Sequence, residues 1–106
     1  MAVNVDTTLA ALADPTRRRV VELLRDRPHR AGELAGRVST SAPAMSRHLR
    51  VLRAGGLVEV EPLETDARIR VYRLRAQPFE ALQRWLPAFW DDQLGAFKAH
   101  AERKRR

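Results

Sequence analysis

One stretch, residues 41–56 (SAPAMSRHLRVLRAGG), constrains the fold more than any other, because it has the start, the two faces and the end of a helix. Ser41 is typical of a residue that caps a helix N-terminus, and Pro43 fits the first turn, where its missing N–H does no harm. Gly55 and Gly56 are typical of the positions just beyond a helix C-terminus. Apolar side chains recur at the i, i+4 and i+7 spacing of one buried stripe: Met45, Leu49 and Leu52.

The opposite side of this predicted helix has a different character. At about 100° per residue it carries small and cationic side chains: Pro43, Ser46, Arg47, Arg50 and Ala54. Small side chains let a helix backbone come close to a surface, and an arginine guanidinium forms paired hydrogen bonds with guanine edges or phosphates. This combination suits a helix in the major groove of DNA. The alternative is an ordinary amphipathic surface helix, and the flanking sequence has to decide between the two.

The distribution of charge favours nucleic acid as the partner. The net charge is +7, from 20 basic and 13 acidic residues. Residues 14–56 contain ten of the basic and four of the acidic residues, so the excess lies on the segment with the candidate recognition helix. A basic patch of this kind is the expected footprint of a nucleic-acid-binding surface. A codon bias toward arginine explains why arginine outnumbers lysine, but not why the charge clusters.

Length and composition argue against several other classes of protein. At 106 residues we expect one small domain, which would gain buried surface from a dimer partner. There is no cysteine, which excludes a disulfide framework, a thiolate metal site and a cysteine nucleophile. No serine or aspartate stands beside a histidine in an obvious nucleophile context, so we expect no enzyme. The N-terminus lacks the features of a signal peptide, and we expect a cytoplasmic protein.

Two helices are predicted before the central stretch, over residues 5–12 and over residues 14–26, the second opened by an aspartate and a proline. Arginines occupy residues 17–19 in the first turn of the second helix, where cations oppose the helix macrodipole. A phosphate bound by Arg17 and the N-terminal N–H groups would relieve this opposition. The alternative is that these arginines are simply solvated.

Residues 31–56 are predicted to form a helix-turn-helix, because a short helix over residues 31–38 is joined to the central helix by only a few residues. The hydrophobic period then changes to two over residues 57–61 and again over residues 68–74. Polar, turn-like residues lie between these two segments. We therefore expect a β-hairpin with about five residues per strand, the wing, within residues 57–75.

Arg68 and Arg70 share one face of the second predicted strand. On a wing, their guanidiniums can reach the DNA minor groove or phosphates. The alternative is an exposed strand face on which Glu59 and Glu61 satisfy them through cross-strand charge pairs. Both interpretations can hold for different residues.

Residues 78–103 are predicted to form a terminal helix that is rich in aromatic residues. Pro87 predicts a kink or a break after Leu86. So much apolar area on the terminal helix of a small domain most often packs against its copy in a dimer, and the alternative is a ligand pocket between this helix and the body of the domain. The predicted dimer interface comprises Leu9, Leu12, Phe79, Leu82, Leu86, Phe89, Trp90, Leu94 and Phe97.

In order and spacing, residues 8–75 resemble the ArsR-type bacterial repressors. The resemblance is carried by the segments ALADPTRRRVVELL, GELAGRV, SAPAMSRHLRVLRAGGLVEVE and RIRVYRL. It implies a mostly α fold with a small β-hairpin wing, that is, a winged helix-turn-helix. It also implies a homodimer that dimerises through its N- and C-terminal helices, recognition helices that enter the major groove, and an inducer that lowers the affinity for the operator.

The family's motif can be carried over residue by residue. By position, the groove contacts would be Ala42, Pro43, Ser46 and Arg47, and Ser41 would cap the helix. His48 also belongs to the motif, but its angle on the helix places it near the buried stripe. This angle favours a structural role, and a base contact is the alternative.

The sequence departs from the metal-sensing members of that family. Those members place cysteines in the helix that corresponds to AGELAGRV, and this sequence has none. Others bind zinc through an Asp-x-His pair and a later His-x-x-Glu, whereas here Asp91 is followed by Asp92 and Gln93, and His100 has Arg103 three residues on. The resemblance is therefore to the metal-independent branch, with no metal, no cofactor and an unknown inducer.

The sequence as a whole predicts a homodimeric, DNA-binding repressor that recognises a palindromic operator. The alternative is a winged-helix protein-interaction module without specific DNA binding, which would favour an uncharged outer face on the central helix. The residues predicted to contact DNA are Ser41, Ala42, Pro43, Ser46, Arg47, His48, Arg50, Arg17, Arg68 and Arg70.

Overall fold

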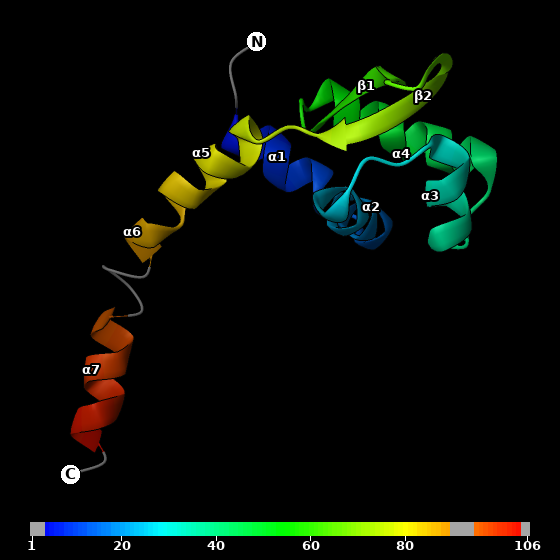
Figure 1. Ribbon diagram of the computed structural model, residues 1–106. Helices are drawn as coiled ribbons and strands as arrows, with labels where there is room; N and C mark the ends of the chain where they lie inside the picture. The colour runs from blue at the N-terminus through cyan, green and yellow to red at the C-terminus, as the bar shows by residue number, and fades with distance from the viewer. Residues whose placement is uncertain (1–3, 90–94, 105–106) are drawn as a thin grey trace.

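The structure is a computed structural model that describes residues 4–89 and 95–104 (Figure 1). Its elements in chain order are α1 (Val5–Ala11), α2 (Pro15–Asp26), α3 (Ala31–Arg37), α4 (Ala42–Ala54), β1 (Val58–Leu63), β2 (Asp66–Leu74), α5 (Gln77–Trp85), α6 (Pro87–Phe89) and α7 (Gly95–Lys104). A mostly helical chain with one antiparallel hairpin is the fold class that the sequence predicts. No helix in the described part of the chain is long and apolar enough to cross a membrane.

Helix α4 begins and ends as its sequence predicts. The Ser41 Oγ accepts a hydrogen bond from the Ala44 N–H at 3.2 Å, which satisfies one of the free donors of the first turn. At the other end, Gly56 has a φ of +76°, and the Leu57 N–H donates to the Leu52 carbonyl at 2.9 Å. These contacts form a Schellman-type end, and glycine adopts its left-handed conformation without steric cost.

The core of the domain lies beneath α4. Met45, Leu49 and Leu52 are 1 %, 2 % and 0 % exposed, as the apolar stripe predicts. They pack in one cluster with residues of α1, α2, α3, β1 and the residue that precedes β1: Ala11, Val20, Leu24, Leu34, Ala35, Val58 and Leu57. Burying each large aliphatic side chain contributes about 1.5–3 kcal/mol. The apolar side of α4 therefore fixes which side of this helix faces outward.

The β-hairpin is longer than about five residues per strand. Residues 62–67 are predicted to form the turn, but Pro62 and Leu63 extend β1, and β2 already begins at Asp66. A proline is tolerated there because each strand of a two-stranded sheet has one edge without a partner, so its missing N–H costs no ladder bond. The pairing register shifts between Pro62 and Leu63, next to the short turn.

A third segment of extended chain pairs with the hairpin. The His29 N–H donates to the Tyr72 carbonyl at 3.1 Å, and the Tyr72 N–H donates to the His29 carbonyl at 2.8 Å. His29 is only 2 % exposed, and its Nδ1 lies 2.7 Å from the Arg27 carbonyl oxygen. The sequence does not predict this bridge, because a single bridging residue leaves no periodic pattern.

The C-terminal helices form an arm that leaves the body of the domain (Figure 1). Helix α5 packs against α1, whereas α6 and α7 lead away from the rest of the chain. The radius of gyration is 18.0 Å, compared with about 13 Å for a compact domain of this length. Of the two predicted outcomes at Pro87, the structure has the break, because α5 ends at Trp85 and α6 begins at Pro87.

Candidate nucleic-acid interface

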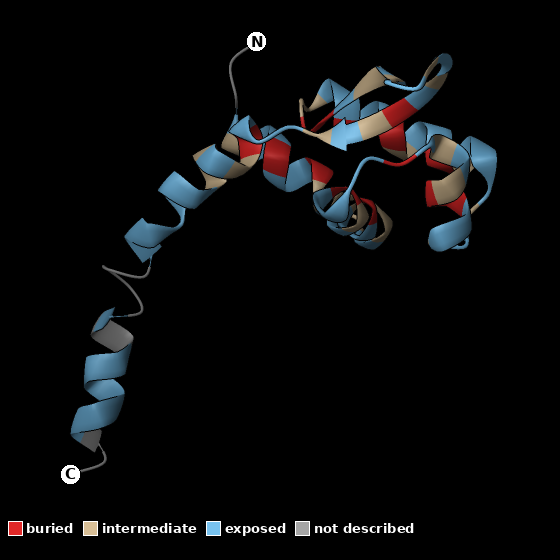
Figure 2. Cartoon of the chain, in the orientation of Figure 1, coloured by how far each residue is buried: buried red, intermediate tan, exposed pale blue. Residues whose placement is uncertain are grey.

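The outer face of α4 is exposed and cationic. Pro43, Ser46, Arg47, Arg50 and Ala54 are all exposed, as the helical spacing predicts, and so is Ala42. Figure 2 shows buried and exposed residues along the ribbon of α4. Within the part of the chain that the structure describes, neither Arg47 nor Arg50 has a carboxylate partner. Both guanidiniums are therefore available to an external anion or base edge. Ser41 is exposed as well, and although its oxygen accepts the capping N–H, its hydroxyl proton is free to donate.

His48 lies on the side of α4 that faces α2. Its side chain is half-buried. The pKa of the Asp14 carboxyl is held below its usual value, first by the Arg17 backbone N–H, then by the Thr16 N–H and by the positive charges of His48 and Arg17. His48 is therefore close to the N-cap of α2. This position supports the structural role that its helical angle predicts.

Arg17 makes contacts that neither sequence interpretation included. Its Nε donates to the Ala11 carbonyl at 2.6 Å, and its Nη2 donates to the Ala10 carbonyl at 3.2 Å. Arg18 similarly reaches the Leu12 carbonyl at 2.8 Å. The prediction that these two arginines are simply solvated is wrong, because they bind the carbonyls at the end of α1. Cations are favourable at that end of a helix, which offsets their unfavourable place at the start of α2.

The register of the hairpin decides which arginines the wing offers. Glu59 lies opposite Arg73, and Glu61 lies opposite Val71, so both glutamates point to the face away from Arg70. Glu61 forms an ion pair with Arg73 at 3.2 Å, and Glu59 lies 4.0 Å from Arg75. Cross-strand charge pairs therefore exist, but the prediction that they involve Arg68 and Arg70 is wrong.

Arg68 and Arg70 differ in what they contact. The Arg68 side chain is 90 % exposed and lies 3.1 Å from the Asp66 carboxylate, which raises the pKa of Arg68 and lowers that of Asp66. An exposed pair of this kind is worth little and exchanges readily for another anion. Arg70 is exposed and has no ion pair with any described residue. The wing thus presents two arginines near its turn.

Three comparisons with known proteins agree with this geometry. Residues 12–61 match the family model described as a helix-turn-helix domain. The chain is 41 % identical over 92 residues to the HTH-type transcriptional regulator Rv2034 of Mycobacterium tuberculosis, covering 87 % of this chain and 83 % of that protein. The ArsR-like transcriptional regulator from Rhodococcus sp. RHA1 has a TM-score of 0.72 and 34 % identity, covering 92 % of this chain and 90 % of that one.

This chain belongs to the ArsR-type family of winged helix-turn-helix regulators. It is a DNA-binding transcriptional regulator, as its sequence predicts. The transcriptional repressor SdpR of Bacillus subtilis is a further relative, 32 % identical over 54 residues, covering 51 % of this chain and 60 % of that protein. The family consists of transcription factors and not, in general, of enzymes.

The predicted dimer residues of this ArsR-type regulator fall into three groups. Leu9, Leu86 and Phe89 are exposed, at 41 %, 38 % and 42 %. Leu12 and Phe79 are partly buried against the core, and Leu82 is half-buried. Trp90 and Leu94 lie outside the described residues. Phe97 belongs to α7, but its side chain is not described.

Trp85 is an exposed aromatic residue that the predicted interface omits. It is 41 % exposed, and its ring meets that of Phe89 edge-on at a centroid distance of 4.8 Å. The sequence could have placed Trp85 in the predicted interface, because it lies three residues after Leu82 and residues at i and i+3 share one side of a helix.

No cluster of three or more potential metal ligands occurs among the described residues. Asp91 and Gln93, which stand at the positions compared above with an Asp-x-His pair, lie outside them. The absence of a metal site therefore stays a prediction from the ligand types in the sequence.

Proposed function

We propose that this regulator is a homodimeric repressor that binds a palindromic operator and is released by a non-metal signal. The observation that carries the proposal is the outer face of α4, which is exposed and has two arginines without a carboxylate partner among the described residues. A helix with such a face fits the major groove, and two of them about 34 Å apart would read half-sites one turn apart.

Within this proposal, residues 31–56 are the helix-turn-helix, residues 57–75 the wing and residues 78–103 the dimerisation segment of one domain that acts in the cytoplasm. Small side chains at the start of α4 would let the helix backbone approach the bases. The residues of this helix and its cap that would contact the bases are Ser41, Ala42, Pro43, Ser46, Arg47 and Arg50. Arg68 and Arg70 would reach the minor groove or its phosphates. Arg17 and His48 would act indirectly, by positioning α1 and α2.

The homodimer is supported by large apolar side chains that are exposed on α1 and on the C-terminal arm, where the Trp85 and Phe89 rings lie together. These side chains are Leu9, Trp85, Leu86 and Phe89, each at least 38 % exposed in the single chain. Large exposed apolar side chains that lie together most often mark a protein interface. Two-fold symmetry brings the same face of each copy together, which suits a palindromic operator.

The alternative function is a protein-interaction module that does not bind DNA specifically. It would favour an uncharged outer face on α4, and the charges found there argue against it. In vitro selection from a random duplex library tests the two directly. We expect enrichment of one palindromic sequence and, by fluorescence anisotropy, tight and salt-sensitive binding of two protomers per site. Equal, weak binding to every duplex would contradict the repressor proposal.

A further inference from the structure

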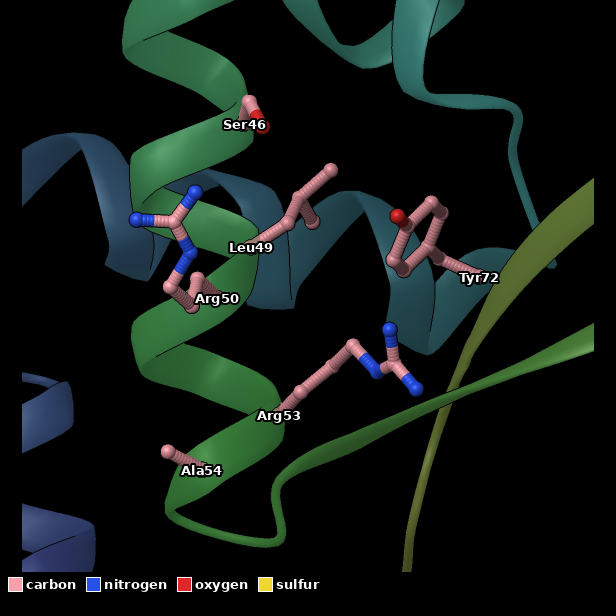
Figure 3. Close-up of a pocket in the computed structure, with 6 residues that line it drawn as sticks. All are labelled: Ser46, Leu49, Arg50, Arg53, Ala54 and Tyr72. Atoms are coloured by element: carbon pink, nitrogen blue, oxygen red, sulfur yellow. The ribbon is translucent and has the colours of Figure 1, made fainter.

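A surface groove of about 410 Å³ lies between α4 and β2 (Figure 3). Arg53 reaches from α4 toward the hairpin, and the Tyr72 ring projects from β2 toward α4. Ser46 lies at one end of the groove. Its lining residues are Ser46, Leu49, Arg50, Arg53, Ala54 and Tyr72. The DNA contacts predicted from the sequence include neither Arg53 nor Tyr72.

The groove is cationic. It is lined by two arginines and by no carboxylate, and neither arginine has an ion pair within the described part of the chain. Two other depressions beside the hairpin differ in this respect, because Glu61 and Glu64 line one and Asp26 lines the other. Two arginines around those depressions are paired with carboxylates, Arg27 with Glu33 at 2.6 Å and Arg73 with Glu61 at 3.2 Å. The groove between α4 and β2 therefore favours an anion.

The structure holds Tyr72 firmly in this groove. Two backbone hydrogen bonds to His29 fix its main chain, and its half-buried side chain packs partly against the core. Because successive side chains of a strand alternate between faces, Arg70 projects from the same face of β2, two residues nearer the wing turn. Cationic side chains thus continue from the groove along the wing.

The position of the groove identifies the anion. If α4 occupies the major groove and the wing the adjacent minor groove, one sugar-phosphate backbone separates them, and it must cross the junction between α4 and β2. We propose that Arg53 and Tyr72 bind a phosphate of this backbone. Arg53 supplies two N–H donors to one phosphate, and the Tyr72 hydroxyl supplies a neutral donor. This inference rests on the proposed mode of DNA binding.

A phosphate contact contributes affinity and not sequence preference, so its loss has a distinct signature. For Arg53→Ala we expect affinity to fall roughly tenfold on both the selected operator and a scrambled duplex. The slope of log affinity against log salt should become shallower by about 0.9 per lost contact, and so by about two per dimer. Tyr72→Phe should lower both affinities by less and leave this slope unchanged, because it removes no charge.

Arg25→Ala is the matched control. Arg25 is an exposed arginine on α2 that lines a depression together with Asp26, so its removal lowers the net charge equally. It should leave the salt slope and both affinities nearly unchanged. An equal effect of Arg25→Ala and Arg53→Ala would show that overall charge explains the result and would overturn the inference. Thermal unfolding of each variant, compared with that of the unmodified protein, checks that the substitution does not unfold the domain.

Neutral methylphosphonate linkages, placed one at a time along the operator, locate the contact. One position between the major-groove half-site and the adjacent minor groove should weaken binding by the unmodified protein but not by Arg53→Ala. If Arg53→Ala instead alters the base preference, Arg53 reads a base and the inference is wrong. If the variant behaves as the unmodified protein on every duplex while operator selection succeeds, the inference fails and the repressor proposal stands.

A free anion in the groove is the remaining possibility. Inorganic phosphate is compared with chloride at equal ionic strength, in DNA titrations of the unmodified protein and of Arg53→Ala. Equal effects of the two salts are expected if the groove holds a backbone phosphate. A much stronger effect of inorganic phosphate, lost in Arg53→Ala, would assign the groove to a free anion and overturn the inference.

Discussion

Helix α4 and the C-terminal arm are both amphipathic, yet they differ in where their apolar sides lie. The apolar stripe of α4 is at most 2 % exposed, whereas Trp85, Leu86 and Phe89 of the arm are 38–42 % exposed. Among the described residues, the apolar stripe of α4 is therefore covered by the rest of the chain, whereas these three side chains of the arm are not. Amphipathic spacing predicts that a face will be buried, but it does not say whether the covering surface belongs to the same chain.

The largest expected effect concerns the buried apolar stripe of α4. Leu52→Ala removes a side chain with 0 % exposure and leaves a cavity between α4 and the rest of the core. We expect the free energy of unfolding to fall by about 2–5 kcal/mol, measured by chemical denaturation. The exposed Val51→Ala on the same helix is the control and should change stability far less. Equal losses would mean that α4 is not packed as described.

Truncation of an apolar side chain on the arm should weaken the dimer. Trp85→Ala removes a large apolar side chain from the proposed dimer face, and we expect the dimer to weaken by about 2 kcal/mol or more. Sedimentation equilibrium measures the dissociation constant directly. Gln83→Ala, which changes an exposed polar residue of the same helix, should leave that constant unchanged. If the unmodified protein is monomeric, or if Trp85→Ala leaves the dissociation constant of the dimer unchanged, the exposed apolar side of the arm is not a dimer interface.

The outer face of α4 should affect DNA binding without affecting stability. Arg47→Ala is expected to cost about 1–3 kcal/mol of operator affinity if Arg47 reads a base, and selectivity should relax at one base pair. Anisotropy titrations on single-base operator variants measure both quantities. The midpoint of thermal unfolding should stay that of the unmodified protein, since the Arg47 side chain is exposed and forms no ion pair with any described residue. Loss of affinity without relaxed selectivity would instead assign Arg47 to a phosphate.

The smallest expected effect concerns the N-cap of α2 in the body of the domain. The lowered pKa of Asp14 means that its carboxylate stabilises the fold above the ordinary pKa of 3.8, and that this contribution disappears as the pH falls through the lower folded pKa. Asp14→Asn keeps a good N-cap but carries no charge. Thermal midpoints of the two proteins should therefore converge as the pH falls from 7 to 3.

Asp26→Asn is the control for this titration. Asp26 is exposed at the C-terminal end of the same helix, where its side chain caps no N–H group. This control separates the loss of one negative charge from α2, which both variants share, from the loss of the charged N-cap that only Asp14→Asn causes. If the thermal midpoints of the two variants depend on pH in the same way, the charge of the Asp14 cap makes no specific contribution to stability.

The contacts that form within a few residues were the most predictable ones. Ser41, the stripe from Met45 to Leu52 and the paired glycines specify the start, the buried side and the end of α4 locally. The break at Pro87 was expected as one of two outcomes, because proline removes a helical N–H wherever the chain folds. The hairpin was predicted too, although its strand lengths were not, since the pairing of Pro62 depends on its partner strand.

The missed contacts depend on chain segments that meet only in the fold. Arg17 and Arg18 bind the end of α1, and no local pattern tells a long, flexible guanidinium which carbonyl it will meet. His29 joins the hairpin through one bridge to Tyr72. The register places Glu59 and Glu61 away from Arg70, and that alignment depends on how the two strands pair.

By itself, the sequence determined the family-level fold, the recognition helix and the outward position of its arginines, because helical periodicity and capping act over three or four residues. Only the tertiary structure decided which arginines stay without a partner, which face of the hairpin meets α4, and that Arg53 and Tyr72 share one groove. The physical reason is that ion pairs, registers and grooves arise between segments far apart in the chain, whose meeting depends on the packing of the whole core.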